Sequence, residues 1–467
     1  MSPYECLYGT DLQDEEKSRD LLKEPSVARV LNAYGQNLAL STPKRVASLE
    51  ARNEAAFWQG EFGRLWVQRI YVFGHPEDRH SVRPFWGFFH LRDEQVLRKL
   101  KEVFKGNVPA VAECYLTLPK LLRDAGYRVI EGPYTAFYGV LPLDVTPLVF
   151  PHRLLAGHCA QSAAHTALML MSSRGARPLG LFDLNLIASA ADQVPDVLVK
   201  NEGLTLDQIA RVLRAKETGI TALQDLSDNN WTAADLISLL RDCVLSELPL
   251  ILAVDFKKWV QGVRKYQEIN LPVIENSWHA VVLVGYRESD RHGTHFLFHD
   301  SFLGPWIQMD VDGLIHATRT TRRSNRTASS LCHMVIPAPR GVTQPITKVT
   351  QAACMTFHGN GCEHCRPAHL KRRLLSREEF IRLYAPHLLT RKRNQSDFVT
   401  DLHLRYPEND LQYIWQVVHI KTPEMTLFYN GGSSSLFAAL EDSRFVLYNP
   451  DRDEVVGTWQ FTQMGLM

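Results

Sequence analysis

Apolar and polar residues along the chain recur with periods that predict alternating strands and helices. In residues 1–148, aromatic and β-branched runs are typical of strands, and other stretches carry apolar residues at helical spacing. The predicted strands are 64–74, 82–91, 108–118 and 127–143, and the predicted helices are 19–40 and 92–104. This pattern predicts an N-terminal α+β domain over residues 1–148, in which no motif indicates a chemistry.

The middle of the chain repeats the mixture of periods. Residues 159–171 have apolar side chains at 160, 163, 164, 167, 168 and 171, which is one face of a helix. Thr205 and Thr232 each begin a capping-box pattern that predicts a further helix. The predicted strands are 248–254, 279–286, 295–299, 306–309 and 331–336. We therefore predict a central α+β domain over residues 149–337.

The last part of the chain follows a stretch rich in Pro and Gly between residues 337 and 345, which predicts a linker. Ser376 begins a capping-box pattern that opens a basic amphipathic helix. Residues 412–421 and 444–448 have the composition of strands. Residues 346–467 are thus predicted to form a C-terminal α+β domain.

Composition narrows the classes of function. The 467 residues suit about three domains, and Lys+Arg of 52 against Asp+Glu of 51 leave no global charge to attract nucleic acid or an anionic membrane. The basic stretches 319–326, 371–373 and 391–393 lack interleaved aromatics, so we interpret them as solvated and expect no nucleic-acid partner. No apolar run reaches the ~20 residues that cross a bilayer. The N-terminus is not a secretory signal, and eight sparse cysteines favour the reducing cytoplasm.

Three short segments place a cysteine, a histidine and an aspartate in the order of a thiol hydrolase. Cys159 follows Gly157 at the start of an amphipathic helix, where free N–H groups and the helix dipole favour a thiolate. His279 begins a very apolar strand, and Asp300 ends the next one. Adjacent antiparallel strands joined by a short connection bring those two ends together. The sequence therefore predicts Cys159 as nucleophile, His279 as base and Asp300 as the group that orients the base.

The segment 150–336 resembles the papain-like superfamily of cysteine peptidases, and within it the bacterial peptidases that cleave double-glycine leader peptides. The likeness lies in the Cys159 helix with its small residues and Leu-x-Met ending, in the His279 strand that runs into Gly285-Tyr286, and in the turn after Asp300. It implies a papain-like central domain, in which the helix bearing the cysteine packs on an antiparallel sheet. It also implies the same three roles for Cys159, His279 and Asp300, and it does not extend to the flanking α+β domains.

Two positions differ from that family and concern the oxyanion hole. Ala160 follows the cysteine where the family has Gly, and Arg153 stands where the family has a Gln that donates to the oxyanion. The backbone N–H of Cys159 can supply one donor. The candidates for the second donor are the polar side chains near the start of the helix, namely His152, Arg153, His158 and Gln161.

These observations predict a cytoplasmic cysteine hydrolase, most simply a peptidase, that needs no cofactor for catalysis and acts on a protein or peptide substrate. Two alternatives stay open: a papain-like acyltransferase, which uses the same triad, and a catalytically silent papain-like binding scaffold. Regulation by a protein partner is compatible with each of them.

A second cluster of residues lies in the C-terminal region. Cys354, Cys362, Cys365 and His369 are four ligands of the types that tetrahedral zinc prefers, in a stretch that Gly and Pro residues allow to turn tightly. His358 and His364 are alternative ligands. The pattern is read either as a structural zinc site or as a thiol-bearing loop without metal.

Overall fold

The computed structural model describes most of the chain. The described ranges are 20–34, 38–46, 67–74, 85–104, 108–130, 134–138, 141–149, 158–189, 203–225, 232–266, 278–288, 293–318, 333–359, 366–388, 392–406, 410–441, 444–449 and 454–460. Helices and antiparallel sheets both occur in them, which confirms the α+β class. Contacts divide the chain into two compact units, Met1–Asn230 with Pro249–Pro337, and Trp231–Leu248 with Ala338–Met467.

The first sheet is built from the N-terminal part of the first unit. Its strand order is β1 (Leu38–Leu40), β3 (Val67–Gly74), β4 (Phe85–Arg92), β5 (Val111–Leu116), β8 (Leu141–Val149) and β7 (Tyr134–Tyr138), and β2 (Lys44–Val46) also pairs with β3. Its helices are α2 (Pro25–Leu31), α4 (Glu94–Phe104) and α5 (Lys120–Asp124). The prediction of one helix over 19–40 was wrong. Pro25 begins α2 with Glu24 as its N-cap, and Leu38–Leu40 instead pairs with β3, a partner that local periodicity does not reveal.

The second sheet carries the predicted site. Its strand order is β13 (Gly304–Asp310), β12 (His295–Asp300), β11 (Trp278–Arg287), β10 (Leu250–Asp255), β14 (Met334–Pro339) and β9 (Ile220–Asp225), and β6 (Arg128–Val129) also pairs with β11. Gly285 makes that last pairing feasible, because a Cβ there would lie 2.7 Å from the carbonyl oxygen of Arg128. The N-terminal part of the chain thus contributes a strand to the sheet that holds His279.

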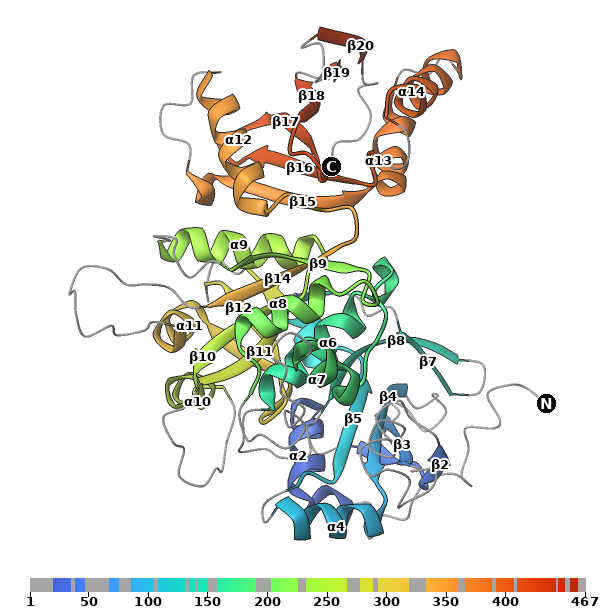
Figure 1. The fold of residues 1–467 in the computed structure, drawn as a ribbon, viewed down its shortest axis with the longest axis vertical. Helices are drawn as coiled ribbons and strands as arrows, with labels where there is room; N and C mark the ends of the chain where they lie inside the picture. The colour runs from blue at the N-terminus through green and yellow to red at the C-terminus, as the bar shows by residue number, and fades with distance from the viewer. Residues whose placement is uncertain are drawn as a thin grey trace. The chain divides into compact units, whose positions relative to one another are not determined.

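Helices pack against this sheet and explain its composition. They are α6 (Cys159–Leu170), α8 (Leu206–Arg214), α10 (Phe256–Val263) and α11 (Val311–Thr318), and α7 (Leu181–Ser189) packs on α6 and α8. Helix α6 packs on β10, β11 and β12 (Figure 1), and α10 packs on β10 and β13. Every residue of β12 is buried, and so is every residue of β11 except Trp278 at its start and Arg287 at its end. Strands covered on both faces have continuous apolar runs rather than alternation, as this sequence does.

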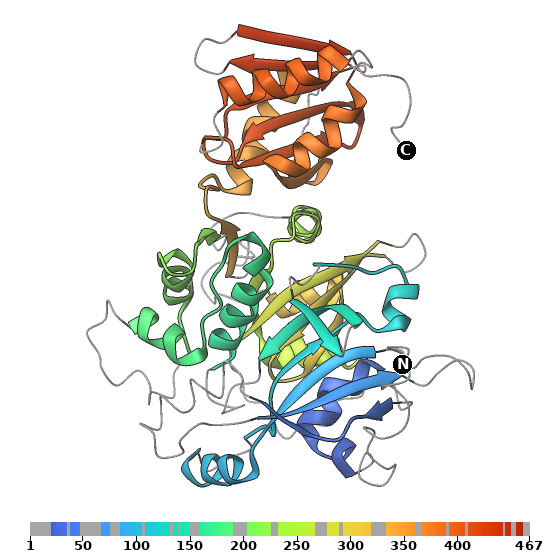
Figure 2. The same cartoon turned by 90° about the vertical axis from the view of Figure 1, so that its right-hand side faces the viewer.

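The second unit contains the third antiparallel sheet and its helices (Figure 2). Strands follow in sequence order as β15 (Leu370–Ser376), β16 (Tyr413–His419), β17 (Thr422–Asn430), β18 (Leu436–Glu441), β19 (Arg444–Asn449) and β20 (Glu454–Gln460). The helices are α9 (Ala233–Leu245), α12 (Ile346–Gly359), α13 (Arg377–Tyr384) and α14 (Lys392–Arg405). Aromatic side chains from α13, α14 and the sheet, among them Phe380, Phe398 and Phe445, form its core.

One basic stretch of this unit differs from the prediction of a solvated face. Arg372 of β15 is only 1% exposed, and its Nε donates to Oδ2 of Asp242, a fully buried residue of α9. Its NH1 and NH2 groups donate to Thr350 at 2.7 Å and to Ser238 at 2.9 Å. The basic residue is therefore part of a buried ion-pair network, whereas its neighbour Lys371 is exposed as predicted.

The units do not decide how many domains the chain has. Helix α9 groups by contact with residues 338–467, although its sequence lies inside the predicted central domain. Compactness is a property of contacts, whereas a domain is a unit that could fold alone, so the division at residues 148 and 337 stays a prediction. Among the residues described, no helix is both long and apolar enough to cross a membrane.

Candidate active site

Cys159 is the first residue of α6, as the sequence predicts. The N-cap residue His158 makes no side-chain capping hydrogen bond, and the first turn contains no acidic residue. The positive end of the helix dipole therefore acts on the thiol without a side-chain carboxylate from this turn to offset it. The backbone N–H of Ala280 also donates to the Cys159 sulfur. Both features favour a thiolate over a thiol.

His279, the second residue of β11, lies between the cysteine and the aspartate. It is 8% exposed, and its Nε2 donates to Oδ1 of Asp300 at 2.8 Å. Its side chain also hydrogen-bonds Cys159. Because Nε2 is occupied by Asp300, Nδ1 is the nitrogen that serves the sulfur. The three predicted residues thus form a row of Cys159, His279 and Asp300.

Asp300 is fully buried and surrounded by donors. Its Oδ1 accepts hydrogen bonds from the backbone N–H groups of Phe302 at 2.7 Å and Leu303 at 3.1 Å, besides the one from His279. Its Oδ2 accepts a hydrogen bond from the indole Nε1 of Trp259 at 2.8 Å. Burial alone would raise the pKa of this carboxyl group, but the charge and the hydrogen bond of His279 and the two amides outweigh it and lower the pKa.

The same charges shift the cysteine and the histidine in opposite directions. Burial would raise the pKa of Cys159, but the charge and hydrogen bond of His279 lower it below the ordinary value. Burial would lower the pKa of His279, but the charges of Asp300 and Cys159 raise it to about 10. The arrangement therefore favours a thiolate next to an imidazolium at neutral pH.

Strand register explains why residues distant in sequence meet here. In the β11–β12 ladder Val282 pairs with His299, so the start of β11 lies beside the end of β12. In the β10–β11 ladder Val254 pairs with His279. Helix α10 follows β10 directly, which brings Trp259 next to the same strand ends. The predicted meeting of His279 and Asp300 follows from this pairing.

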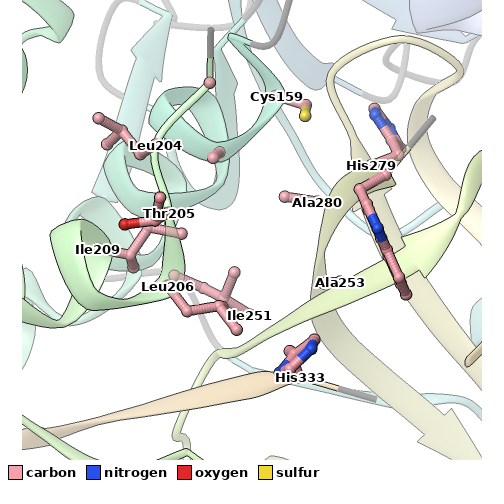
Figure 3. A pocket seen from close by; sticks show the side chains of 13 residues that line it. Cys159, Leu204, Thr205, Leu206, Ile209, Ile251, Ala253, His279, Ala280 and His333 are labelled. Carbon is pink, nitrogen blue, oxygen red and sulfur yellow. The ribbon is translucent and has the colours of Figure 1, made fainter. Parts of the chain in front are cut away.

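A cavity of about 350 Å³ opens beside the sulfur (Figure 3). Cys159 and His279 lie at one end of it, and Ile251 and His333 lie at the other. Its described lining contains no Asp, Glu, Lys or Arg. The lining residues are Cys159, Ala160, Gly203, Leu204, Thr205, Leu206, Ile209, Ile251, Ala253, Trp278, His279, Ala280 and His333. Apart from the catalytic pair, the space is mostly apolar.

The candidates for the second oxyanion donor are not gathered at this cavity. Gln161 is 4% exposed, and its Oε1 has no hydrogen-bond partner within the described structure. Neither Gln161 nor His158 lines the cavity. His152 and Arg153 lie outside the described residues. The identity of this donor therefore stays a prediction.

Sequence reasoning missed the aromatic residues that surround the His279–Asp300 pair. Phe256 has its ring centroid 4.7 Å from that of His279, and Trp259 donates to Asp300. A signal for the helix that carries them was available: Asp255 is an N-cap residue, followed by apolar residues at 256, 259, 260 and 263. Nothing in the sequence indicates that the helix faces Asp300.

The predicted zinc ligands are only partly described. Cys354 lies in α12 and His369 in the short helix Pro367–His369, whereas Cys362, Cys365 and the alternative ligand His364 lie outside the described residues. The other alternative, His358, is near the end of α12. Within the described ranges, no three His, Cys, Asp or Glu side chains are grouped as a metal site requires. Zinc therefore stays a prediction.

No known protein-family model matches this chain, and no curated protein matches it either.

Proposed function

We propose that this protein is a cysteine hydrolase with a papain-like central domain, and that it cleaves peptide bonds. The observation that carries the proposal is the row of hydrogen bonds from Cys159 through His279 to the buried carboxylate of Asp300. A structural histidine needs a partner on its ring, but it does not need a half-buried thiol at a helix N-terminus as its second partner. We propose the cytoplasm as the compartment, because the eight cysteines are too sparse in the sequence to indicate a disulfide framework.

The proposed reaction uses the Cys159 thiolate as nucleophile and His279 as proton donor and acceptor. The Cys159 thiolate attacks the carbonyl carbon of the substrate, and the carbonyl electrons move onto the oxygen. As the tetrahedral intermediate collapses, the imidazolium Nδ1–H of His279 gives its proton to the departing amine, which leaves a thioester on Cys159. Neutral His279 then takes a proton from water, and the hydroxide attacks the thioester. The second tetrahedral intermediate collapses by breaking the C–S bond, which releases the carboxylic acid and the Cys159 thiolate. The acid loses its proton to solvent, and the thiolate–imidazolium pair is restored with Asp300 holding the ring throughout.

The lining of the cavity beside Cys159 indicates which substrate side chain fits there. A charged side chain placed there would lose its hydration without a counterion among the described lining residues, and burying an unpaired charge is unfavourable by several kcal/mol. An apolar side chain gains from the contact. We therefore expect cleavage next to an uncharged, apolar residue.

The test is digestion of a mixed peptide library by wild-type protein and by Cys159→Ala, read by mass spectrometry. The expected result is a set of new peptide ends with wild type and none with the variant, which must have an unchanged circular dichroism spectrum and melting temperature. With a weakly nucleophilic amine supplied as acceptor, a hydrolase should give mainly the carboxylic acid, whereas an acyltransferase should give mainly the amide. A Cys159→Ala chain that keeps the biological activity would favour the binding scaffold instead.

A further inference from the structure

Helix α10 places two aromatic side chains on the pair that follows the cysteine. Phe256 and Trp259 are three residues apart, so they lie on the same face of the helix. The ring of Phe256 lies 4.7 Å from His279 and 5.1 Å from Phe302, which follows Asp300 by two residues. The indole of Trp259 is fully buried and crosses the ring of Phe298 edge-on at 5.1 Å. One helix face therefore contacts both the imidazole and the turn that holds the carboxylate.

The hydrogen bond from Trp259 has a geometric consequence for Asp300. Oδ1 is held by His279 and by two backbone amides, whereas Oδ2 has Trp259 as its described side-chain donor at 2.8 Å. A carboxylate held on both oxygens cannot rotate about its Cβ–Cγ bond without losing bonds on both sides. Its orientation fixes the direction of the lone pair that receives Nε2–H of His279.

Helix α10 is itself firmly seated, as a positioning element must be. A Cβ on Gly262 would lie 2.7 Å from the sulfur of Met309 and 3.6 Å from the Cα of Gly313 in α11. The two helices therefore approach closely at a pair of glycines. Arg29 of α2 also faces the Asp300 turn, because its NH1 donates to the carbonyl oxygen of Phe302 at 2.9 Å.

We propose that Trp259, supported by Phe256, is a positioning residue that sets the orientation of Asp300 and hence the ring of His279 toward Cys159. This inference depends on the proposed function of the triad. Trp259 is not among the described residues that line the cavity, so we expect its effect on the site to pass through Asp300.

The experiment measures the rate of Cys159 alkylation by iodoacetamide from pH 5 to pH 10 in full-length protein. Wild type should react over a wide plateau, because the thiolate–imidazolium pair persists between the two shifted pKa values. Trp259→Phe should slow alkylation about tenfold on the acid side, the effect of one lost hydrogen bond to a buried charge. It should narrow the plateau from that side only, because the thiolate still reacts at alkaline pH. Phe256→Leu should narrow the same plateau to a smaller extent, and it serves as the second variant if Trp259→Phe does not fold.

The matched control is Trp306→Phe. Trp306 is 1% exposed and belongs to the same sheet, and its indole donates to the hydroxyl of Tyr34 at 3.1 Å rather than to the triad. We expect this variant to keep the width of the plateau, even if it melts at a lower temperature. A plateau that narrows as much in Trp306→Phe as in Trp259→Phe would assign both effects to general destabilisation and overturn the inference.

A double-mutant cycle separates this inference from the proposed function. In an Asp300→Asn background, Trp259→Phe should cause no further loss, since the tryptophan acts only through that carboxylate. Equal losses in both backgrounds would refute the positioning role while leaving the triad intact. A wild-type Cys159 that reacts no faster at pH 6 than Cys354 would instead refute the proposed function itself.

Discussion

Replacing Asp300 by Asn removes one charge from the site and retains its shape. In the wild-type protein Asp300 and Cys159 together raise the pKa of His279 to about 10, against the opposing effect of burial. The rise in the pKa of His279 from the ordinary value of 6.5 corresponds to about 5 kcal/mol of net stabilisation of the imidazolium, at 1.36 kcal/mol per pKa unit. That figure is the net of favourable charges and unfavourable burial, so it does not give the share of Asp300. Breaking a buried ion pair costs about 3–5 kcal/mol, and we take about 3 kcal/mol for Asp300.

The sign of the effect follows from which forms carry charge. Without Asp300, burial favours the neutral imidazole, so the pKa of His279 falls. Cys159 then loses the positive charge that lowers its own pKa, and the site holds a thiol with a neutral imidazole at pH 6. A stabilisation of about 3 kcal/mol corresponds to about a hundredfold in thiolate population. The difference between variant and wild type should shrink as the pH rises, because the variant thiol ionises at alkaline pH.

The assay compares alkylation rates of individual cysteines by mass spectrometry. Cys354 is half-buried and lies outside the site, so in protein treated with a chelator it reports on general access. Cys114 and Cys243 are buried, and burial together with a neighbouring carboxylate raises the pKa of each thiol, so they should stay unlabelled in a folded chain. At pH 6, Asp300→Asn should slow Cys159 about a hundredfold and leave Cys354 unchanged. A rate for Cys159 within about twofold of wild type would refute the ion-pair reasoning.

Three further outcomes are expected. Ala253→Leu narrows the cavity and should reduce kcat/KM at least about tenfold for peptides with a large apolar residue at the cleavage site, with little effect on iodoacetamide alkylation; equal losses for glycine-containing peptides would exclude the cavity as the determinant. Arg372→Met removes a partner of the buried Asp242 carboxylate and should lower the free energy of unfolding in urea by about 3 kcal/mol. Lys371→Met, at the exposed neighbouring position, is the control and should change it by less than about 0.5 kcal/mol. The purified protein should contain about one zinc per chain, absent after Cys362→Ser with Cys365→Ser; fully folded protein free of zinc would contradict the metal site.

Local sequence predicted the elements that carry the triad. The apolar run that follows His279 and the apolar run that ends at Asp300 are both buried strands, and the small-residue helix begins at Cys159. These features follow from patterns within about ten residues, which is the range over which periodicity is informative. The meeting of His279 with Asp300 was predictable as well, because the two strands are consecutive and antiparallel.

Contacts between distant segments could not be predicted in this way. Trp259 donates to a carboxylate 41 residues further along the chain, and Arg372 pairs with a carboxylate 130 residues before it. Leu38–Leu40 forms a strand because it pairs with β3, which begins more than 25 residues later in the sequence. Each outcome depends on which surfaces meet in three dimensions, and the sequence of one chain contains that information only through the whole fold.

The central claim is that Cys159 forms an acyl-enzyme with the help of His279. The most direct measurement is intact-mass and peptide mass spectrometry of the protein after brief mixing with an activated ester such as p-nitrophenyl acetate at pH 7. The claim predicts a burst of about one p-nitrophenolate per chain, one acetyl group on the peptide that contains Cys159, and slower loss of that group by hydrolysis. His279→Ala should form the adduct much more slowly. Acetylation of other residues, or a folded chain that leaves Cys159 unmodified, would contradict the claim.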